Sequence, residues 1–248
     1  MDIITLAIIA ALIGFCAGTI SGLLGVGGGL IMVPLMIFLL GRDFQEATTA
    51  SIFVILFVSI VGSYEHHRTG HVDKKMGLIL GLTGSMGAVL GSYINSITDA
   101  RILMFLFAVM LLISAYRFFT KDTEKKVENK WVLPFIGLGG GFVAGLLGLG
   151  GGIVMVQGMV YIGIPIHMAV GTSLFAMIFN ATAAVATHTL LGNLVLSVAI
   201  PMTIGAVLGT VGGSAASDKV PAKRLKQIFA VFMIFIGIYM MVRALGAI

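Results

Sequence analysis

Long apolar segments bounded by charged residues constrain the fold of this chain most strongly. Most of them have about the 20 residues that an α-helix needs to cross a bilayer core. Charged residues make up only 10% of the chain, against roughly 25% in soluble domains, so a polar exterior cannot be built. We therefore predict an all-α polytopic membrane protein. Its eight apolar segments are residues 3–40, 47–64, 76–95, 102–119, 131–162, 168–187, 194–215 and 226–247.

The two halves of the chain resemble each other. Gly18–Val33 aligns with Gly141–Val156 at an offset of 123, and all five glycines from the fifth residue of the pattern onward are identical. Further on, Ser51 pairs with Ser173 and His66 with His188 at an offset of 122. The sequence therefore predicts two homologous four-segment repeats. Their expected bounds are residues 1–120 and 131–248, joined by a polar linker over residues 121–130.

The distribution of positive charge bears on the topology. If all eight segments cross, nine of the 15 Lys and Arg residues share one side of the membrane. If segments one and five instead turn back as glycine-broken hairpins, twelve share one side, which agrees better with the positive-inside tendency. The two halves would then be inverted copies, an architecture that recurs among transporters. We expect the hairpin topology, with full crossing of all segments as the alternative.

Two glycine clusters are the first candidate site. Glycines in series are unfavourable inside a helix, so each cluster is expected to end or unwind one. Backbone N–H groups freed there, beside a helix N-terminus, can hold an anion. The alternative is close helix packing, which explains the regular Gly14/Gly18/Gly22 spacing. The clusters comprise Gly25, Gly27, Gly28 and Gly29, and Gly148, Gly150, Gly151 and Gly152.

Hydroxyl residues near the starts of segments two and six are the second candidate group. They are Thr48, Thr49 and Ser51 in the first half and Thr172 and Ser173, after Gly171, in the second. Such hydroxyls face an anion at a helix N-terminus, or they cap the helix and bond to its preceding turn. Asn180 lies about two turns deeper and either contacts substrate or bonds a neighbouring helix. Because its counterpart is Val58, that role belongs to one half.

Histidines raise two further possibilities. His66, His67, His71 and His188 would be the ligands of an intramembrane metalloenzyme, which is the competing functional class. We expect surface histidines instead, because the second half keeps only His188. Proton coupling is a separate hypothesis for His66 and His188, since histidine titrates near neutral pH, and for the carboxylate of Glu46.

The placement of charge favours an anionic substrate. All ten carboxylates fall in connections or at segment ends, whereas carriers of protons or metal cations usually keep carboxylates within the membrane. We predict a transporter and no enzyme, with no catalytic residue, metal or cofactor. A passive anion channel is a further alternative. Expected partners are a small anion and the lipid bilayer, and no nucleic acid. A homodimer is also possible, because small-residue faces suit packing within or between chains.

The paired glycine motifs, Gly171-Thr172-Ser173 and the His188…Gly192-Asn193 ending resemble the sulfite exporter TauE/SafE permeases over essentially the whole chain. The resemblance implies a multi-pass protein of a prokaryotic inner or plasma membrane that moves sulfur oxyanions such as sulfite or organosulfonates. It further implies a substrate path along both glycine clusters, Ser51, Thr172 and Ser173. The family's proline after the first cluster is Pro34 here, but Gln157 stands in the second half. Gln157 is therefore either an asymmetric substrate contact or neutral drift.

Overall fold

The computed structural model describes residues 2–25, 27–119, 130–191, 196–216 and 222–246 of the chain. Within these ranges the protein is all α, so the predicted fold class is confirmed. The described part forms ten α-helices and one short 3₁₀ helix: α1 (Ile3–Leu24), α2 (Gly29–Leu40), α3 (Phe44–Arg68), α4 (Lys74–Ile97), α5 (Ala100–Phe119), η1 (Lys130–Val132), α6 (Leu133–Leu147), α7 (Gly152–Tyr161), α8 (Ile166–Leu190), α9 (Leu196–Ala216) and α10 (Ala222–Ala244).

The helices match the eight apolar segments of the sequence. Segments one and five each form two helices, and the other six each form one. Within the described ranges, α1, α3, α4, α8 and α9 are long and apolar enough to cross a membrane. The predicted linker over residues 121–130 lies outside the described residues except for Lys130, and the division into two repeats stays a prediction.

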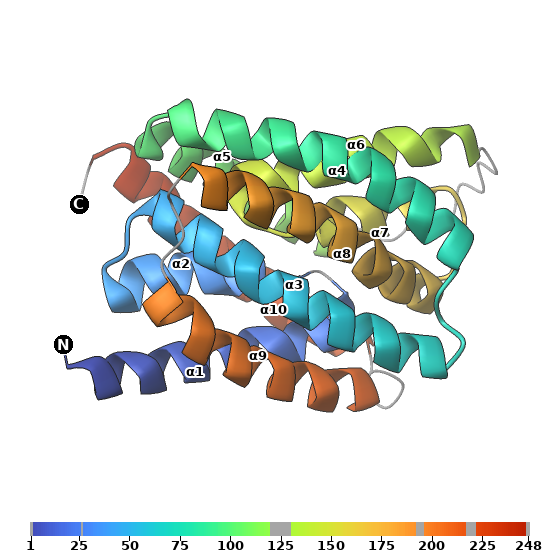
Figure 1. The fold of residues 1–248 in the computed structure, drawn as a ribbon, viewed down its shortest axis with the longest axis horizontal. Coiled ribbons are helices and arrows are strands. Elements are labelled where there is room, and N and C mark those ends of the chain that lie inside the picture. The colour runs from blue at the N-terminus through green and yellow to red at the C-terminus, as the bar shows by residue number, and fades with distance from the viewer. Residues whose placement is uncertain (1, 26, 120–129, 192–195, 217–221, 247–248) are drawn as a thin grey trace.

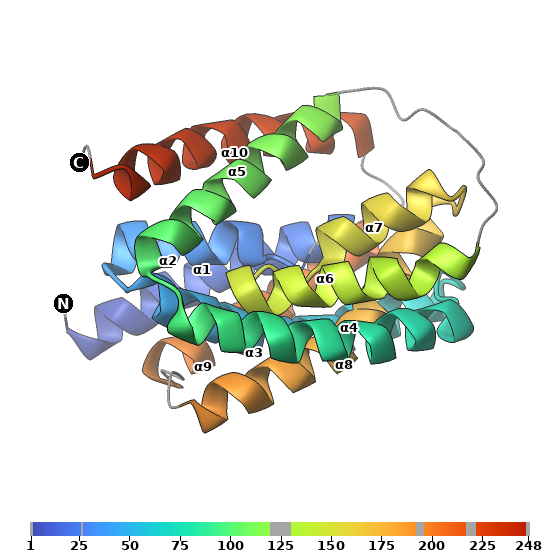
Figure 2. The same cartoon turned by 90° about the horizontal axis from the view of Figure 1, so that it is seen from above.

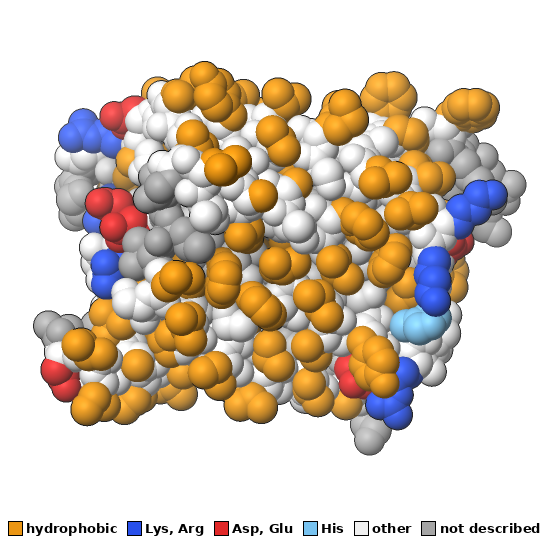
Figure 3. Space-filling model, in the orientation of Figure 1, with side chains coloured by type: hydrophobic (Ala, Val, Ile, Leu, Met, Phe, Trp, Pro, Cys, Tyr) orange, Lys and Arg blue, Asp and Glu red, His pale blue; other side chains and the backbone are white. Residues whose placement is uncertain are grey.

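The outer surface is what a bilayer requires. Charged side chains gather at the two ends of the long helices, and an apolar surface covers the length between them (Figure 3). Exposed apolar side chains on this surface include Leu82 and Met86 of α4 and Ile204 and Leu208 of α9. Because the surface is continuous along the helices, their long axis runs across the membrane.

The α1–α2 unit and the α6–α7 unit each return to the end of the molecule at which they begin, and these two ends are opposite. Both termini of the described chain and the α2–α3 and α4–α5 connections lie at one end (Figure 1). The opposite end holds the α3–α4 and α7–α8 connections, and Figure 2 shows the same course from above. We call this opposite end the basic end, after Arg68, Lys74 and Lys75, which lie there. This course is that of the hairpin topology; the descent of both halves from one unit stays a prediction.

Helices from the two halves pack together through glycine. α1 packs along α9, and α6 packs along α4. A Cβ at Gly18 would lie 2.7 Å from the Cα of Ala206, and one at Gly141 would lie 2.7 Å from the Cα of Gly84. Backbones approach this closely only where side chains are absent, so the predicted packing role of the spaced glycines is confirmed.

The remaining helices place the two glycine-broken hairpins at the centre. α3 and α8 pack on each other, and α2 and α7 pack against them. α5 and α10 form a pair that lies beside the hairpins (Figure 2). Each hairpin is thus held between the central α3–α8 pair and the outer α5–α10 pair.

Candidate functional site

Both glycine clusters break their helix as the sequence predicts. α1 ends at Gly25, where φ is 65°, and α2 starts after Gly28, where φ is 68°. In the second half Gly148 has a φ of 72° and Gly151 one of 76°. Residues that carry a Cβ rarely adopt this left-handed backbone conformation, so glycine is required at these four positions. Each hairpin therefore contains a point of irregular backbone between two apolar helices.

The two breaks lie against each other at the centre of the protein. A Cβ at Gly27 would lie 3.0 Å from the carbonyl oxygen of Leu149 and 3.7 Å from the Cα of Gly150. One at Gly29 would lie 2.9 Å from the Cα of Leu149. The breaks meet backbone to backbone, directly before the first residues of α2 and α7.

Two serines link each break to the other half of the chain. Ser51 of α3 donates a hydrogen bond of 2.9 Å from its Oγ to the carbonyl oxygen of Gly148. Ser173 of α8 donates one of 3.1 Å to the carbonyl oxygen of Gly25, besides a bond to its own helix. Both serines are fully buried. The structure thus brings two predicted site residues into direct contact with the predicted clusters.

Apolar side chains fill the space beside the clusters. The Cε of Met177 would lie 2.5 Å from a Cβ at Gly27 and 2.6 Å from one at Gly150. The Cγ2 of Ile55 would lie 2.9 Å from that Cβ at Gly150. Close packing, the alternative explanation of the clusters, therefore applies in this conformation. Binding of any ligand between the two breaks would require them to move apart.

Two buried histidines bond the helices that end at the clusters. The Nε2 of His66 lies 3.1 Å from the carbonyl oxygen of Gly22, and that of His188 lies 3.4 Å from that of Gly145. The Nδ1 of His188 also lies 3.3 Å from the hydroxyl of Thr49. The expectation of surface histidines at the end of segment two is wrong for His66, because its ring is buried between helices. His188 is buried as well.

Other predicted residues lie away from the breaks or bond their own helix. Thr48 bonds the carbonyl oxygen of Phe44 in its own helix. Thr172 accepts a hydrogen bond from the backbone of Asp73 and so holds the α3–α4 connection. Asn180 donates to the sulfur of Met155 at 3.8 Å, which is a packing contact. Glu46 pairs with Arg42 at 3.5 Å, at the end opposite the basic end.

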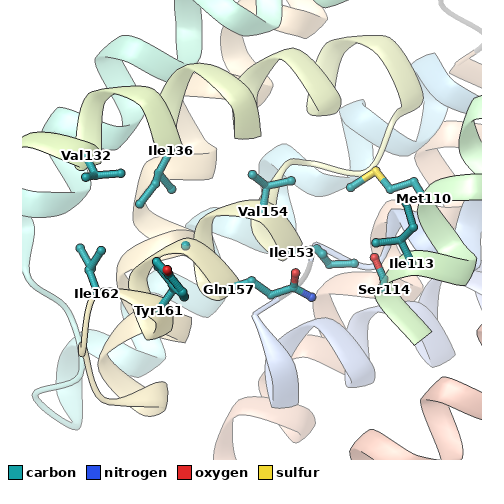
Figure 4. A pocket seen from close by; sticks show the side chains of 11 residues that line it. Met110, Ile113, Ser114, Val132, Ile136, Ile153, Val154, Gln157, Tyr161 and Ile162 are labelled. Atoms are coloured by element: carbon teal, nitrogen blue, oxygen red, sulfur yellow. The ribbon is translucent and has the colours of Figure 1, made fainter. Parts of the chain in front are cut away.

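Gln157 lines a pocket between α5, α6 and α7. The pocket has a volume of about 560 Å³ and is mainly apolar. The side chain of Gln157 extends across it toward α5, where Ser114 lies (Figure 4). The other lining residues are Met110, Ile113, Val132, Ile136, Ile153, Val154, Gly158, Tyr161 and Ile162.

The histidines do not assemble into the ligand set that a metalloenzyme would need. In the part of the chain that the structure describes, no three His, Cys, Asp or Glu side chains are grouped so that they could hold a metal ion. His188 lies with Thr49 and α6, whereas His66 lies with α1.

Sequence reasoning missed two groups of residues. Ile55 and Met177 close over the clusters, and their pairing at an offset of 122 was a usable signal. His167 of α8 lies beside His71, with ring centroids 5.5 Å apart. No sequence pattern predicted that contact, because the two residues come from different halves.

A profile of the sulfite exporter TauE/SafE family matches residues 10–240. The chain belongs to this family. It is 27% identical to the probable membrane transporter protein YunE of Bacillus subtilis (strain 168), over 93% of this chain and 95% of that protein. It is 24% identical to the probable membrane transporter protein MJ0441 of Methanocaldococcus jannaschii, over 93% of this chain and 93% of that protein. A Haemophilus influenzae protein of the same description is 26% identical, over 96% of this chain and 99% of its own length. No solved structure matches the chain significantly.

Membership in the TauE/SafE family decides the location of the protein. Together with the five helices long enough to span a bilayer, it makes the chain a multi-pass integral membrane protein. The family and the names of its relatives indicate a membrane transporter rather than an enzyme.

Proposed function

We propose that this protein is a secondary permease for small anions, most of all sulfur oxyanions such as sulfite or organosulfonates, and that it works by alternating access. The family's description as a sulfite exporter supports the substrate class. The observation that carries the proposal is the reciprocal pair of contacts Ser51–Gly148 and Ser173–Gly25, which joins two helix breaks at the centre of the molecule.

The donors at this centre suit an oxyanion. The first N–H groups of α2 and α7 point out of their helix N-termini, where the helix dipole favours negative charge. Ser51 and Ser173 add two hydroxyl donors, which bond carbonyl oxygens while the breaks are in contact. An anion that separates the breaks offers each hydroxyl a charged acceptor, and hydrogen bonds to charged groups are stronger.

The positions of charged residues support an anion site that is built from uncharged hydrogen-bond donors. In the described helices, Asp, Glu, Lys and Arg occur only near the helix ends. A carrier for metal cations would need carboxylates along its path. Backbone N–H and hydroxyl groups can bind an anion without a buried positive charge, and an anion held in this way is also released readily.

A difference between the two hairpins, at the C-terminal parts of α2 and α7, favours alternating access. At α2, Phe38 packs edge-on against Tyr239 of α10, with ring centroids 5.3 Å apart. Tyr161 of α7 aligns with Phe38 at an offset of 123, and it lines the pocket beside α5. The first hairpin is therefore closed against α10 where the second leaves a pocket against α5. We propose that the two arrangements exchange during transport, and that Gln157 lines the path.

Flux into proteoliposomes tests the proposal. Purified protein is reconstituted, and uptake of labelled sulfite, sulfate and methanesulfonate is measured against empty liposomes and against the neutral solute glycerol. We expect saturable uptake of at least one sulfur oxyanion and none of glycerol. Absence of saturable uptake for all three anions refutes the permease. Conductance far above carrier turnover in planar bilayers favours the passive channel instead.

A further inference from the structure

Three histidine rings lie in series at the basic end. His66 is in the last turn of α3, His71 is in the α3–α4 connection, and His167 is in the first turn of α8. Ring centroids are 6.5 Å apart from His66 to His71 and 5.5 Å apart from His71 to His167. Polar groups at separations of this order are commonly bridged by a water molecule. We call these three residues the imidazole series.

The imidazole series leads from the surface into the protein. His167 is exposed, His71 is half-buried, and His66 is only 3% exposed. At the inner end, the Nε2 of His66 lies 3.1 Å from the carbonyl oxygen of Gly22, in the last turn of α1. α1 ends three residues later at Gly25, whose carbonyl oxygen accepts the bond from Ser173. The series therefore connects the surface with the helix that forms the first break.

The matching histidine of the other half is enclosed differently. His188 is 0% exposed, and its Nδ1 lies 3.3 Å from the hydroxyl of Thr49. The residue that aligns with Thr49 is Gly171, and a Cβ there would lie 2.9 Å from the Cβ of His66. Gly171 has no side chain, so the hydroxyl that Thr49 places beside His188 is not repeated beside His66. The ring of His66 lies next to that of His71 instead.

The rest of the series has no counterpart either. At an offset of 122, Gln45 aligns with His167 and Asn193 with His71. Asn193 lies outside the described residues. The side-chain amides of Gln45 and Asn193 do not gain or lose protons near neutral pH, whereas imidazole does. A series of proton-exchanging side chains therefore exists in one half only.

The charged groups around the series are accounted for. α3 brings Glu65 and Arg68, which pair at 3.8 Å. α4 begins with Lys74 and Lys75, and Asp73 before it accepts a bond from the backbone N–H of Met76. α8 brings only His167 and His188, α1 has Cys16 as its one ionisable side chain, and α9 has none. Among the described residues, imidazoles are thus the ionisable groups between the basic surface and α1.

We propose that the imidazole series carries protons between the basic end and the first helix break, and so couples anion movement to proton movement. This rests on the proposed permease function and adds its coupling ion. Each proton enters from water at the basic end onto the ring of His167 or His71 and passes to His66. It stays on His66 while the anion moves, and it is released on the other side of the membrane once the two hairpins have exchanged their arrangements. One proton offsets one negative charge of the anion, which lowers the electrical work of moving that anion across the bilayer.

The experiment separates coupling from transport. Methanesulfonate is the probe, because it stays fully ionised between pH 5 and pH 8. Counterflow, the exchange of labelled for unlabelled probe, measures transport without a driving force. Uptake driven by an imposed pH gradient, with the membrane potential clamped by potassium and valinomycin, measures coupling. The variants are His71→Gln and His167→Gln, and the matched control is His67→Gln, an exposed histidine of the same turn outside the series.

We expect His71→Gln and His167→Gln to lose at least about 5-fold of the gradient-driven uptake and to keep counterflow. His67→Gln should resemble the wild type in both assays. Gradient-driven uptake that is unchanged in His71→Gln overturns the proton route, as does wild-type counterflow that coexists with no response to the pH gradient. Absence of wild-type counterflow overturns the proposed transport of sulfonates instead, and the proton route with it.

Discussion

Ser51 of α3 donates a hydrogen bond to the carbonyl oxygen of Gly148, the residue at which α6 ends in the other half of the chain. Ser173 bonds Gly25 in the corresponding way. Each serine therefore belongs to a helix of one half and holds the broken helix of the other. Movement of one hairpin away from the other half would break such a contact, which is the coupling that the proposed alternating access requires.

The glycine face of α6 predicts a sharp contrast between two neighbouring positions. Gly141→Ala places a Cβ 2.7 Å from the Cα of Gly84, and such overpacking destabilises by about 1–3 kcal/mol. Gly139→Ala meets nothing within 4 Å and should stabilise α6 by up to ~1 kcal/mol through helix propensity. Thermal unfolding in detergent measures both. Equal stability of the two variants would contradict the packing of α6 on α4.

The glycine clusters combine backbone strain with tight packing, and Gly41 separates the two effects. Gly41 has a φ of 61° with open space around it, so Gly41→Ala should show strain alone, about 1–2 kcal/mol. Gly150→Ala has the same strain and also meets Ile55 and Met177. We expect a clearly larger loss of stability for Gly150→Ala in the same unfolding assay. A loss no greater than that of Gly41→Ala would mean that the clusters are loosely packed.

The pocket beside α7 predicts a difference between two aligned positions. Val154 lines the pocket and is partly exposed, whereas Ile31, which aligns with it at an offset of 123, is 4% exposed. In a Cys16→Ser background, Val154→Cys should react with a charged thiol reagent and Ile31→Cys should not. Reaction of Val154→Cys only with a lipid-soluble maleimide would show that the pocket is filled by lipid and not by water.

The orientation in the membrane follows from the basic end. The positive-inside tendency predicts that this end faces the cytoplasm. In the same Cys16→Ser background, Asp99→Cys in the α4–α5 connection should be labelled by an impermeant reagent on intact cells, and Lys75→Cys only after lysis. The reverse pattern would place the basic end outside.

The sequence was sufficient for the helices and the breaks, because these depend on local composition. Apolar length predicts where helices run, and glycine in series predicts where Leu24 and Leu147 end theirs. It was not sufficient for the contacts across halves. Thr172 and Ser173 are neighbours in the chain, yet Thr172 holds Asp73 and Ser173 holds Gly25, since adjacent helical residues point in different directions. Likewise, the buried position of His66 depends on how closely α1 approaches α3.

The central claim is that the hydroxyls at the two breaks bind the transported anion. The most direct test is the affinity for sulfite, measured as KM of uptake in proteoliposomes, in Ser51→Ala and Ser173→Ala. The control is Ser85→Ala, which removes a hydroxyl bonded only within α4. Loss of one hydrogen bond to a charged ligand, about 1.5–3 kcal/mol, predicts a KM about 10- to 150-fold higher for either site variant and an unchanged KM for the control. A KM that is unchanged in both site variants, in protein that still transports, would contradict the account.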